Sequence, residues 1–177
     1  MTWKEKLRRR VCVWWWRLMY GKIEKSFHLP STGIRPHHLL LILPPSFAHF
    51  DVARQMIEPI IAHMKPRLVT LLVPENFCTW ISRALDVRVM AYDFRKRNFL
   101  GFPKVDMRRK VGEIEADVAV DLMPEFSAYT AALAAASDAP VRISLDSRQE
   151  PGFFNVFIET DGEKDWGKRY ETLLRYV

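Results

Sequence analysis

Two aspartates follow predicted strands, where a parallel sheet presents side chains to a ligand. Asp51 comes shortly after the apolar segment 38–43, and Asp121 ends the apolar segment 116–122. A carboxylate there can act as a general base on an acceptor hydroxyl, and two carboxylates in one crevice would bind substrate hydroxyls. Each also has a simpler role. Asp51, in a first helical turn, complements the helix dipole, and Asp121 can accept hydrogen bonds from loop amides. Position alone favours these simpler roles.

Three further polar residues belong to the same predicted edge. Ser46 is placed to cap the helix that follows the first strand, and His49 lies just beyond it. Arg148 follows the fifth predicted strand and could hold a phosphate, although an exposed loop arginine is more often only solvated. With Asp121, these three residues form the candidate substrate-binding set.

Several common chemistries leave no trace in this sequence. The seven glycines are too far apart to form even Gly-x-Gly, which excludes the glycine-rich turns of dinucleotide-binding sites and P-loops. There is no Gly-x-Ser-x-Gly elbow for a serine nucleophile and no histidine pair with metal-ligand spacing. Cys12 and Cys78 form no CxxC pair. We therefore expect no cofactor, no metal and no disulfide.

The elements that must position these residues alternate along the chain. Apolar runs bounded by breaker residues predict strands over 38–43, 67–73, 87–92, 116–122, 141–145 and 153–159. Helical periodicity predicts helices over 47–64, 75–85, 125–137 and 165–176. Residues 93–115 break this rhythm and are predicted to be a basic loop. The pattern predicts a single Rossmann-like α/β domain with a doubly wound, mostly parallel sheet.

Residues 1–27 are predicted to form a basic, tryptophan-rich amphipathic helix ahead of this domain. The side chains expected to contact a membrane or a partner are Trp3, Leu7, Arg8, Arg9, Arg10, Trp14, Trp15 and Leu18. This composition is typical of a helix that lies in a membrane interface. The same apolar side chains would also pack on the domain's own sheet or on the second subunit of a homodimer.

The breaker residues Pro30, Gly33 and Pro36 make 28–37 a predicted linker, so that the α/β domain spans 38–177. No apolar run approaches the ~20 residues of a membrane-spanning helix, and no small-residue cleavage site follows the basic N-terminus. We expect a cytoplasmic protein, peripheral to the inner membrane if the N-terminal helix binds lipid.

Three stretches of the chain follow one another in an informative order: the strand LLLILPP, then Phe50-Asp51-Val52, then VAVDLMPEFSAYTAALAAASDAPVRISLD. Over 38–177 this order resembles the acceptor-side, N-terminal domain of the heptosyltransferase-like glycosyltransferases of family 9, which have a GT-B fold. This resemblance implies that Asp51 occupies the position of the family's catalytic base.

Two departures from the family pattern argue against catalysis. Phe50 stands where the family has glycine, and its ring is expected to crowd an acceptor. The second, donor-binding domain of a GT-B enzyme is also missing from this chain, and transfer depends on holding the donor phosphates in position.

The sequence therefore leans toward a protein that is not an enzyme by itself. The leading hypothesis is a glycosyltransferase-like domain that binds a glycolipid precursor, a membrane surface or a protein partner. The alternative is an acceptor-binding half that works with a separate donor-binding subunit. The net charge of +6 favours anionic partners. Nucleic acid is the least favoured of these, because the basic loop 95–110, with Phe94, Phe99 and Phe102, belongs to no known nucleic-acid-binding motif.

Overall fold

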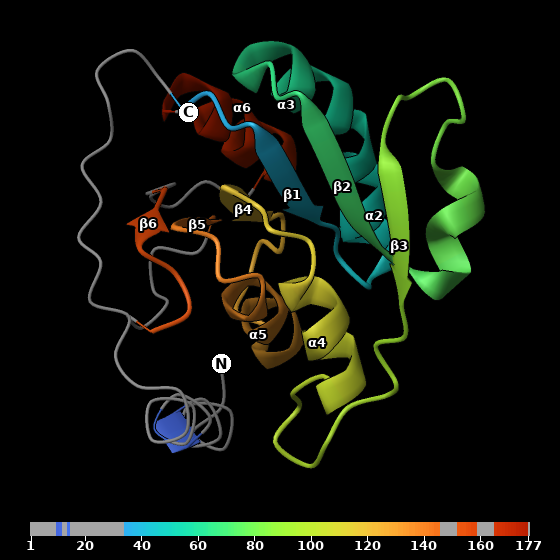
Figure 1. The fold of residues 1–177 in the computed structure, drawn as a ribbon. Coiled ribbons are helices and arrows are strands. Elements are labelled where there is room, and N and C mark those ends of the chain that lie inside the picture. The colour runs from blue at the N-terminus through green and yellow to red at the C-terminus, as the bar shows by residue number, and fades with distance from the viewer. Residues whose placement is uncertain (1–9, 12–13, 15–33, 146–151, 159–164, 177) are drawn as a thin grey trace.

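The computed structural model describes residues 34–145, 152–158 and 165–176, together with Arg10, Val11 and Trp14 (Figure 1). Six strands form one sheet in the order β3-β2-β1-β4-β5-β6, and every pair is parallel. The strands are β1 (His38–Ile42), β2 (Leu68–Pro74), β3 (Arg88–Tyr92), β4 (Val118–Asp121), β5 (Val141–Ser144) and β6 (Val156–Phe157). The predicted Rossmann-like, doubly wound fold class is confirmed, with all strands parallel.

The central strand β1 shows why the sequence run is apolar without interruption. Leu39 and Leu41 pack into one hydrophobic cluster, whereas Leu40 and Ile42 pack into another. Successive side chains of a strand point to opposite faces of its sheet. Because both faces of this sheet are covered, a strand at its centre must be apolar at every position.

Helices of different character cover the two faces (Figure 1). The first face carries α2 (Phe47–Gln55), α3 (Ile57–Met64) and α6 (Trp166–Tyr176), and the second carries α4 (Val105–Gly112) and α5 (Ala128–Ala136). The small side chains of α5 let that helix lie close to the sheet, and Ser127 caps it by accepting a hydrogen bond from the Thr130 amide.

The expected long helix over 47–64 is wrong, because α2 and α3 are separate helices that meet at Met56. Pro59 lies in the first turn of α3, where its missing N–H costs nothing. In a continuous helix the same ring would clash with the carbonyl group of Gln55. The proline therefore ends one helix and starts the next.

Two other segments also differ from the prediction. The helix expected over 75–85 is only the short 3-10 helix η1 (Glu75–Trp80), a type that rarely extends beyond a few residues. The basic segment 93–115, expected to be a loop throughout, contains the helix α4. The helix buries little more than Val111, so its many lysines and arginines gave the segment the composition of an exposed loop.

The N-terminal predictions are covered only in part. Of the helix expected over 1–27, the structure describes Arg10, Val11 and Trp14, which are helical and exposed. The other residues of the expected contact surface, Trp3, Leu7, Arg8, Arg9, Trp15 and Leu18, lie outside the described residues. Ile34 and Pro36, at the end of the predicted linker, are buried against the domain. No helix within the described residues is long and apolar enough to cross a membrane.

Candidate functional site

A hollow of about 370 Å³ lies at the carboxyl edge of the sheet, beside the ends of three neighbouring strands. Open α/β sheets bind their ligands at this edge. The hollow is lined by residues that follow β1 (Pro45), that end or follow β2 (Pro74, Glu75, Asn76), and that end or follow β3 (Tyr92, Asp93, Phe94, Arg95). Its wall thus combines apolar rings with a small set of polar groups, the usual make-up of a small-molecule site.

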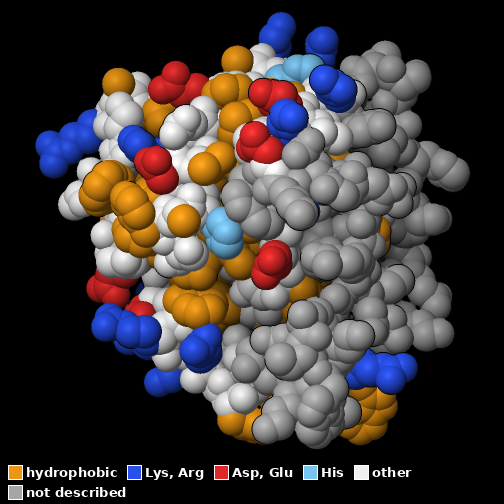
Figure 2. All heavy atoms as spheres, turned by 180° about the vertical axis from the view of Figure 1, so that it is seen from behind, with side chains coloured by type: hydrophobic (Ala, Val, Ile, Leu, Met, Phe, Trp, Pro, Cys, Tyr) orange, Lys and Arg blue, Asp and Glu red, His pale blue; other side chains and the backbone are white. Residues whose placement is uncertain are grey.

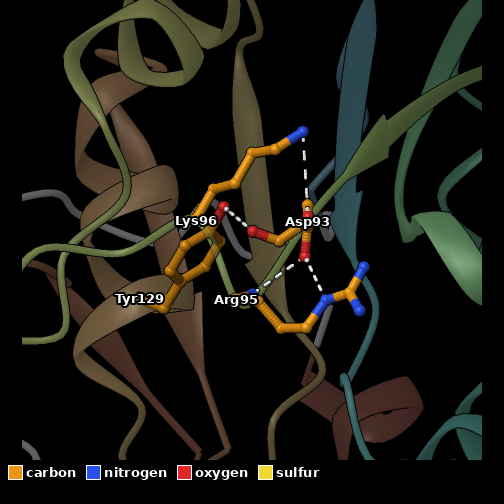
Figure 3. A network of polar contacts seen from close by, with 4 residues as sticks. All are labelled: Asp93, Arg95, Lys96 and Tyr129. Atoms are coloured by element: carbon orange, nitrogen blue, oxygen red, sulfur yellow. Dashed lines mark hydrogen bonds and ion pairs between the residues drawn. The ribbon is translucent and has the colours of Figure 1, made fainter.

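Asp93 organises the polar side of this hollow (Figure 3). Its Oδ1 accepts hydrogen bonds from the Arg95 backbone amide at 2.9 Å and from Arg95 Nε at 3.2 Å, and its Oδ2 lies 3.7 Å from Lys96 Nζ. The donors of Arg95 lower the pKa of Asp93. The carboxylate therefore stays ionised at neutral pH and holds two cations at the rim.

Two tyrosine hydroxyls fix the backbone next to this polar group. The Tyr92 hydroxyl donates to the Leu43 carbonyl at 2.6 Å, which ties the end of β3 to the end of β1. The Tyr129 hydroxyl, on α5, donates to the Asp93 carbonyl at 3.0 Å. Burial raises the pKa of Tyr92 well above its usual range and that of Tyr129 to about 12. Both hydroxyls are thus neutral donors that hold the edge in one arrangement.

Asp121 ends β4 but does not line the hollow. It is fully buried, and its carboxylate accepts hydrogen bonds from Thr130 Oγ1 at 2.8 Å and from the Met123 amide at 3.0 Å. Burial raises the pKa of Asp121 to about 7, although these two hydrogen bonds lower it in part. The residue anchors the loop after β4 to helix α5, which is the simpler of its two predicted roles.

Asp51 is the fifth residue of α2, so its expected place in the first helical turn is wrong. Its Oδ1 lies 2.8 Å from a guanidinium nitrogen of Arg54, and the side chains of the two residues are 39% and 37% exposed. Since Asp121 is buried and turned toward α5, the structure does not bring these two carboxylates together in one open crevice.

Of the remaining predicted residues, the structure describes Ser46 and His49, at the start of α2. Ser46 is the exposed N-cap of α2, but its side chain makes no capping hydrogen bond. His49 is partly buried within α2, and Arg148 lies outside the described residues. Phe50 does not crowd an acceptor, because it is fully buried and stacks on Phe77 with ring centroids 4.6 Å apart.

Beside the hollow lies an exposed aromatic pair that the sequence analysis did not single out. Phe47, at the start of α2, meets Trp80, at the end of η1, with ring centroids 5.3 Å apart, and both side chains are about half exposed. Figure 2 shows hydrophobic side chains gathered on the left of the face that α2 and α3 cover. Exposed apolar patches of this kind often mark binding surfaces.

The sequence reasoning missed Glu75, Asn76, Asp93 and Arg95 as candidate site residues. Glu75 and Asp93 directly follow β2 and β3, and Asn76 and Arg95 come shortly after them, so the rule that drew attention to Asp121 also applies to these residues. They were overlooked because Glu75 was assigned to a helix and 93–115 to a loop. No group of His, Cys, Asp or Glu within the described residues is arranged to hold a metal ion.

Comparison with known proteins gives a match in fold but none in sequence. No protein-family model and no curated protein matches the chain. Among solved structures, the chain is similar to E. coli heptosyltransferase WaaC with ADP, with a TM-score of 0.57 and 16% sequence identity. The similarity covers 79% of this chain and 46% of that protein, so the chain spans about half its length. The chain therefore has a Rossmann-like α/β fold similar to part of that heptosyltransferase.

Proposed function

We propose that this chain is a glycosyltransferase-like binding domain that holds the sugar-phosphate headgroup of a glycolipid precursor and does not transfer sugar by itself. The observation that carries the proposal is the hollow at the ends of β1, β2 and β3, with Arg95 at its rim. The heptosyltransferase-like fold supports a carbohydrate ligand, and the location agrees with the edge where open α/β sheets bind.

The lining offers the contacts that a phosphorylated sugar requires. Glu75 and Asn76 supply acceptors and an amide donor for hydroxyl groups. Arg95 is 87% exposed while its Nε is held by Asp93, which leaves the outer guanidinium nitrogens directed to solvent. A guanidinium oriented in this way can bind two phosphate oxygens at once. The lining of the hollow therefore offers partners for both the hydroxyl groups of a sugar and its phosphate.

The two aspartates that the sequence marked as candidate site residues do not line the hollow, which supports binding over catalysis. A general base must come within hydrogen-bond reach of the proton that it removes. Asp51, the base implied by the family resemblance, is not among the residues that line the hollow and is paired with Arg54. Asp121 is buried beneath the surface. Neither carboxylate is available to a hydroxyl bound in this hollow.

Titration of the full chain with glucose 1-phosphate, followed by NMR, tests the proposal. We expect shifts in the amides of 75–76 and 92–95, and no such shifts with glucose. Arg95→Gln should weaken binding about ten-fold, as expected for the loss of a charge-assisted hydrogen bond. Arg88→Gln, at the opposite end of strand β3, is the matched control and should bind normally. Shifts confined to another region, or equal affinity of Arg95→Gln and the parent chain, would contradict the proposal.

The 46% coverage of the heptosyltransferase supports a second candidate, the acceptor-binding half of a transferase whose donor is held by a separate unit. In both candidates the chain by itself holds no nucleotide-diphosphate sugar, and they differ in whether sugar transfer is observed once a donor-binding unit is added. Calorimetry should detect no binding of that donor if the chain only holds the acceptor side. Clear donor binding by the chain would instead point to a more complete enzyme and would contradict the non-catalytic proposal.

A further inference from the structure

The loop between β3 and α4 is built as a stable projection. Arg97 and Pro103 form an isolated antiparallel bridge, and the Asn98 amide donates to the Phe102 carbonyl at 2.9 Å. The Asn98 side chain accepts from the amides of Leu100 and Phe102 at 3.1 and 3.0 Å. Gly101, with φ 90°, adopts the turn conformation that other residues rarely reach. In Figure 1 this loop extends past α4 at the bottom of the view.

Its apolar side chains are divided between the core and the solvent. Leu100 and Phe102 are buried in the hydrophobic cluster beneath α4 and α5. Phe99, between the bridge and these anchors, is 90% exposed, and Val105 at the start of α4 is 68% exposed. A large apolar side chain held in water on a fixed loop has an unfavourable hydration free energy. Contact with an apolar phase would remove that cost.

The surroundings of Phe99 are strongly basic. Residues 94–111 contain seven lysines and arginines against a single acidic residue, Asp106. Lys96, within the loop, has a side chain that is 67% exposed. An apolar tip with basic neighbours is complementary to a bilayer that carries anionic headgroups, since the charges remain at the headgroups while the ring enters the boundary below them.

The same loop is poorly suited to single-stranded nucleic acid. Such binding requires aromatic faces on which successive bases stack. Of the three interleaved phenylalanines, Phe102 is buried, and Phe94 packs edge-on against Tyr129 while Arg97 covers its ring at 4.5 Å. Only Phe99 offers an open ring, so the loop presents one apolar point and no stacking platform.

From this geometry we propose that the loop 94–104 is a membrane-docking element, in which Phe99 inserts at the headgroup boundary of an anionic bilayer. Lys96 and the basic residues of α4 contact the lipid phosphates. Because Phe94 and Arg95 belong both to this loop and to the lining of the hollow, docking holds the hollow close to the bilayer. The docking contact requires no ligand in the hollow, so it stands even if the proposed function fails.

Co-sedimentation of the full chain with vesicles tests this element directly. We expect binding to phosphatidylcholine vesicles that contain phosphatidylglycerol, and none to phosphatidylcholine alone. Phe99→Ser should lower the partition coefficient about ten-fold, from the loss of one buried aromatic side chain, and Phe99→Trp should retain binding. Lys96→Gln should lower it about five-fold, the effect of one basic residue near such a surface. Added salt should weaken binding in every case.

The matched control is Leu68→Ser, because Leu68 is about half exposed at the opposite edge of the sheet. This variant should bind like the parent chain, and urea unfolding should give Phe99→Ser the same midpoint as the parent. Absence of vesicle binding, equal binding to both lipid compositions, or full binding by Phe99→Ser would overturn the proposal. Phe99-dependent binding to a single-stranded oligonucleotide in place of vesicles would also overturn it.

Discussion

Asp93 and Asp121 both stand at the carboxyl edge of the sheet, yet their surroundings differ completely. Asp93 follows β3 at the rim of the hollow, where the donors of Arg95 lower its pKa. Asp121 ends β4 under helix α5, where burial raises its pKa to about 7. The two aspartates therefore have different roles. Asp93 is an ionised group at the rim of the hollow, and Asp121 is a buried group that anchors the β4 end. What packs over a strand end decides its chemistry.

The pH dependence of folding should separate these two aspartates with the largest effect. Asp121 has a folded pKa near 7 against about 3.9 in the unfolded chain. Between those values only the folded state holds the proton, so its contribution to stability falls as pH rises. The fall should total roughly 4 kcal/mol between about pH 4 and pH 7. Asp121→Asn should remove this slope from a series of urea unfolding curves, and parallel pH profiles of variant and parent would contradict the assignment.

Removal of the hydroxyl group that donates to Asp121, or of the one that donates to Asp93, tests the same comparison through folding stability. Thr130→Val deletes the buried donor to Asp121 and should cost about 1–3 kcal/mol, because the carboxyl group cannot find water as a replacement. Tyr129→Phe deletes the donor to the Asp93 carbonyl at the more open side and should cost at most about 1 kcal/mol. Urea unfolding at one fixed pH measures both. Equal losses of stability in the two variants would mean that the surroundings of Asp93 and Asp121 are equally buried, which would contradict the comparison.

The smallest expected effect is that of Asp93, whose contribution to folding stability changes with pH in the opposite direction to that of Asp121. The pKa of Asp93 is lowered in the folded state, so its contribution to stability is present above the unfolded pKa and is lost as pH falls through the folded one. Asp93→Asn should therefore remove a weak loss of stability in acid, below pH 4. Thermal unfolding between pH 2 and pH 5, values set by the ordinary carboxyl pKa, can detect this difference. A loss at alkaline pH would contradict the proposed pairing with Arg95.

Much of the fold was predictable because its signals are local. The apolar run of β1 and the segments that became β2, β4 and β5 were located to within a few residues, since strands covered on both faces admit few polar side chains. Helix α4 was missed for the converse reason: it buries so little that its sequence resembles a basic loop. The break at Met56 depends on Pro59, a signal that was present in the sequence but was not applied.

The candidate site was less predictable than the fold. The sequence predicted a site at the carboxyl edge of the sheet, where the hollow lies, but it predicted that Asp51 and Asp121 meet there. The structure pairs Asp51 with Arg54 and buries Asp121 against Thr130. The hollow instead gathers residues from segments near positions 45, 75 and 93. Their proximity follows from the strand order, which no local pattern in this sequence specifies.

The sequence by itself determined that the chain builds a parallel, doubly wound sheet, because periodicity and breaker residues act over short stretches. It also determined the charge of the 94–111 segment. Only the tertiary structure decided which strand ends are covered and which are open. Tyr170, from the distant helix α6, donates to the Leu122 carbonyl at 2.6 Å and helps to close the β4 end. The Asp93 carboxylate instead stays at the lining of the hollow, because burial depends on long-range contacts that no single segment encodes.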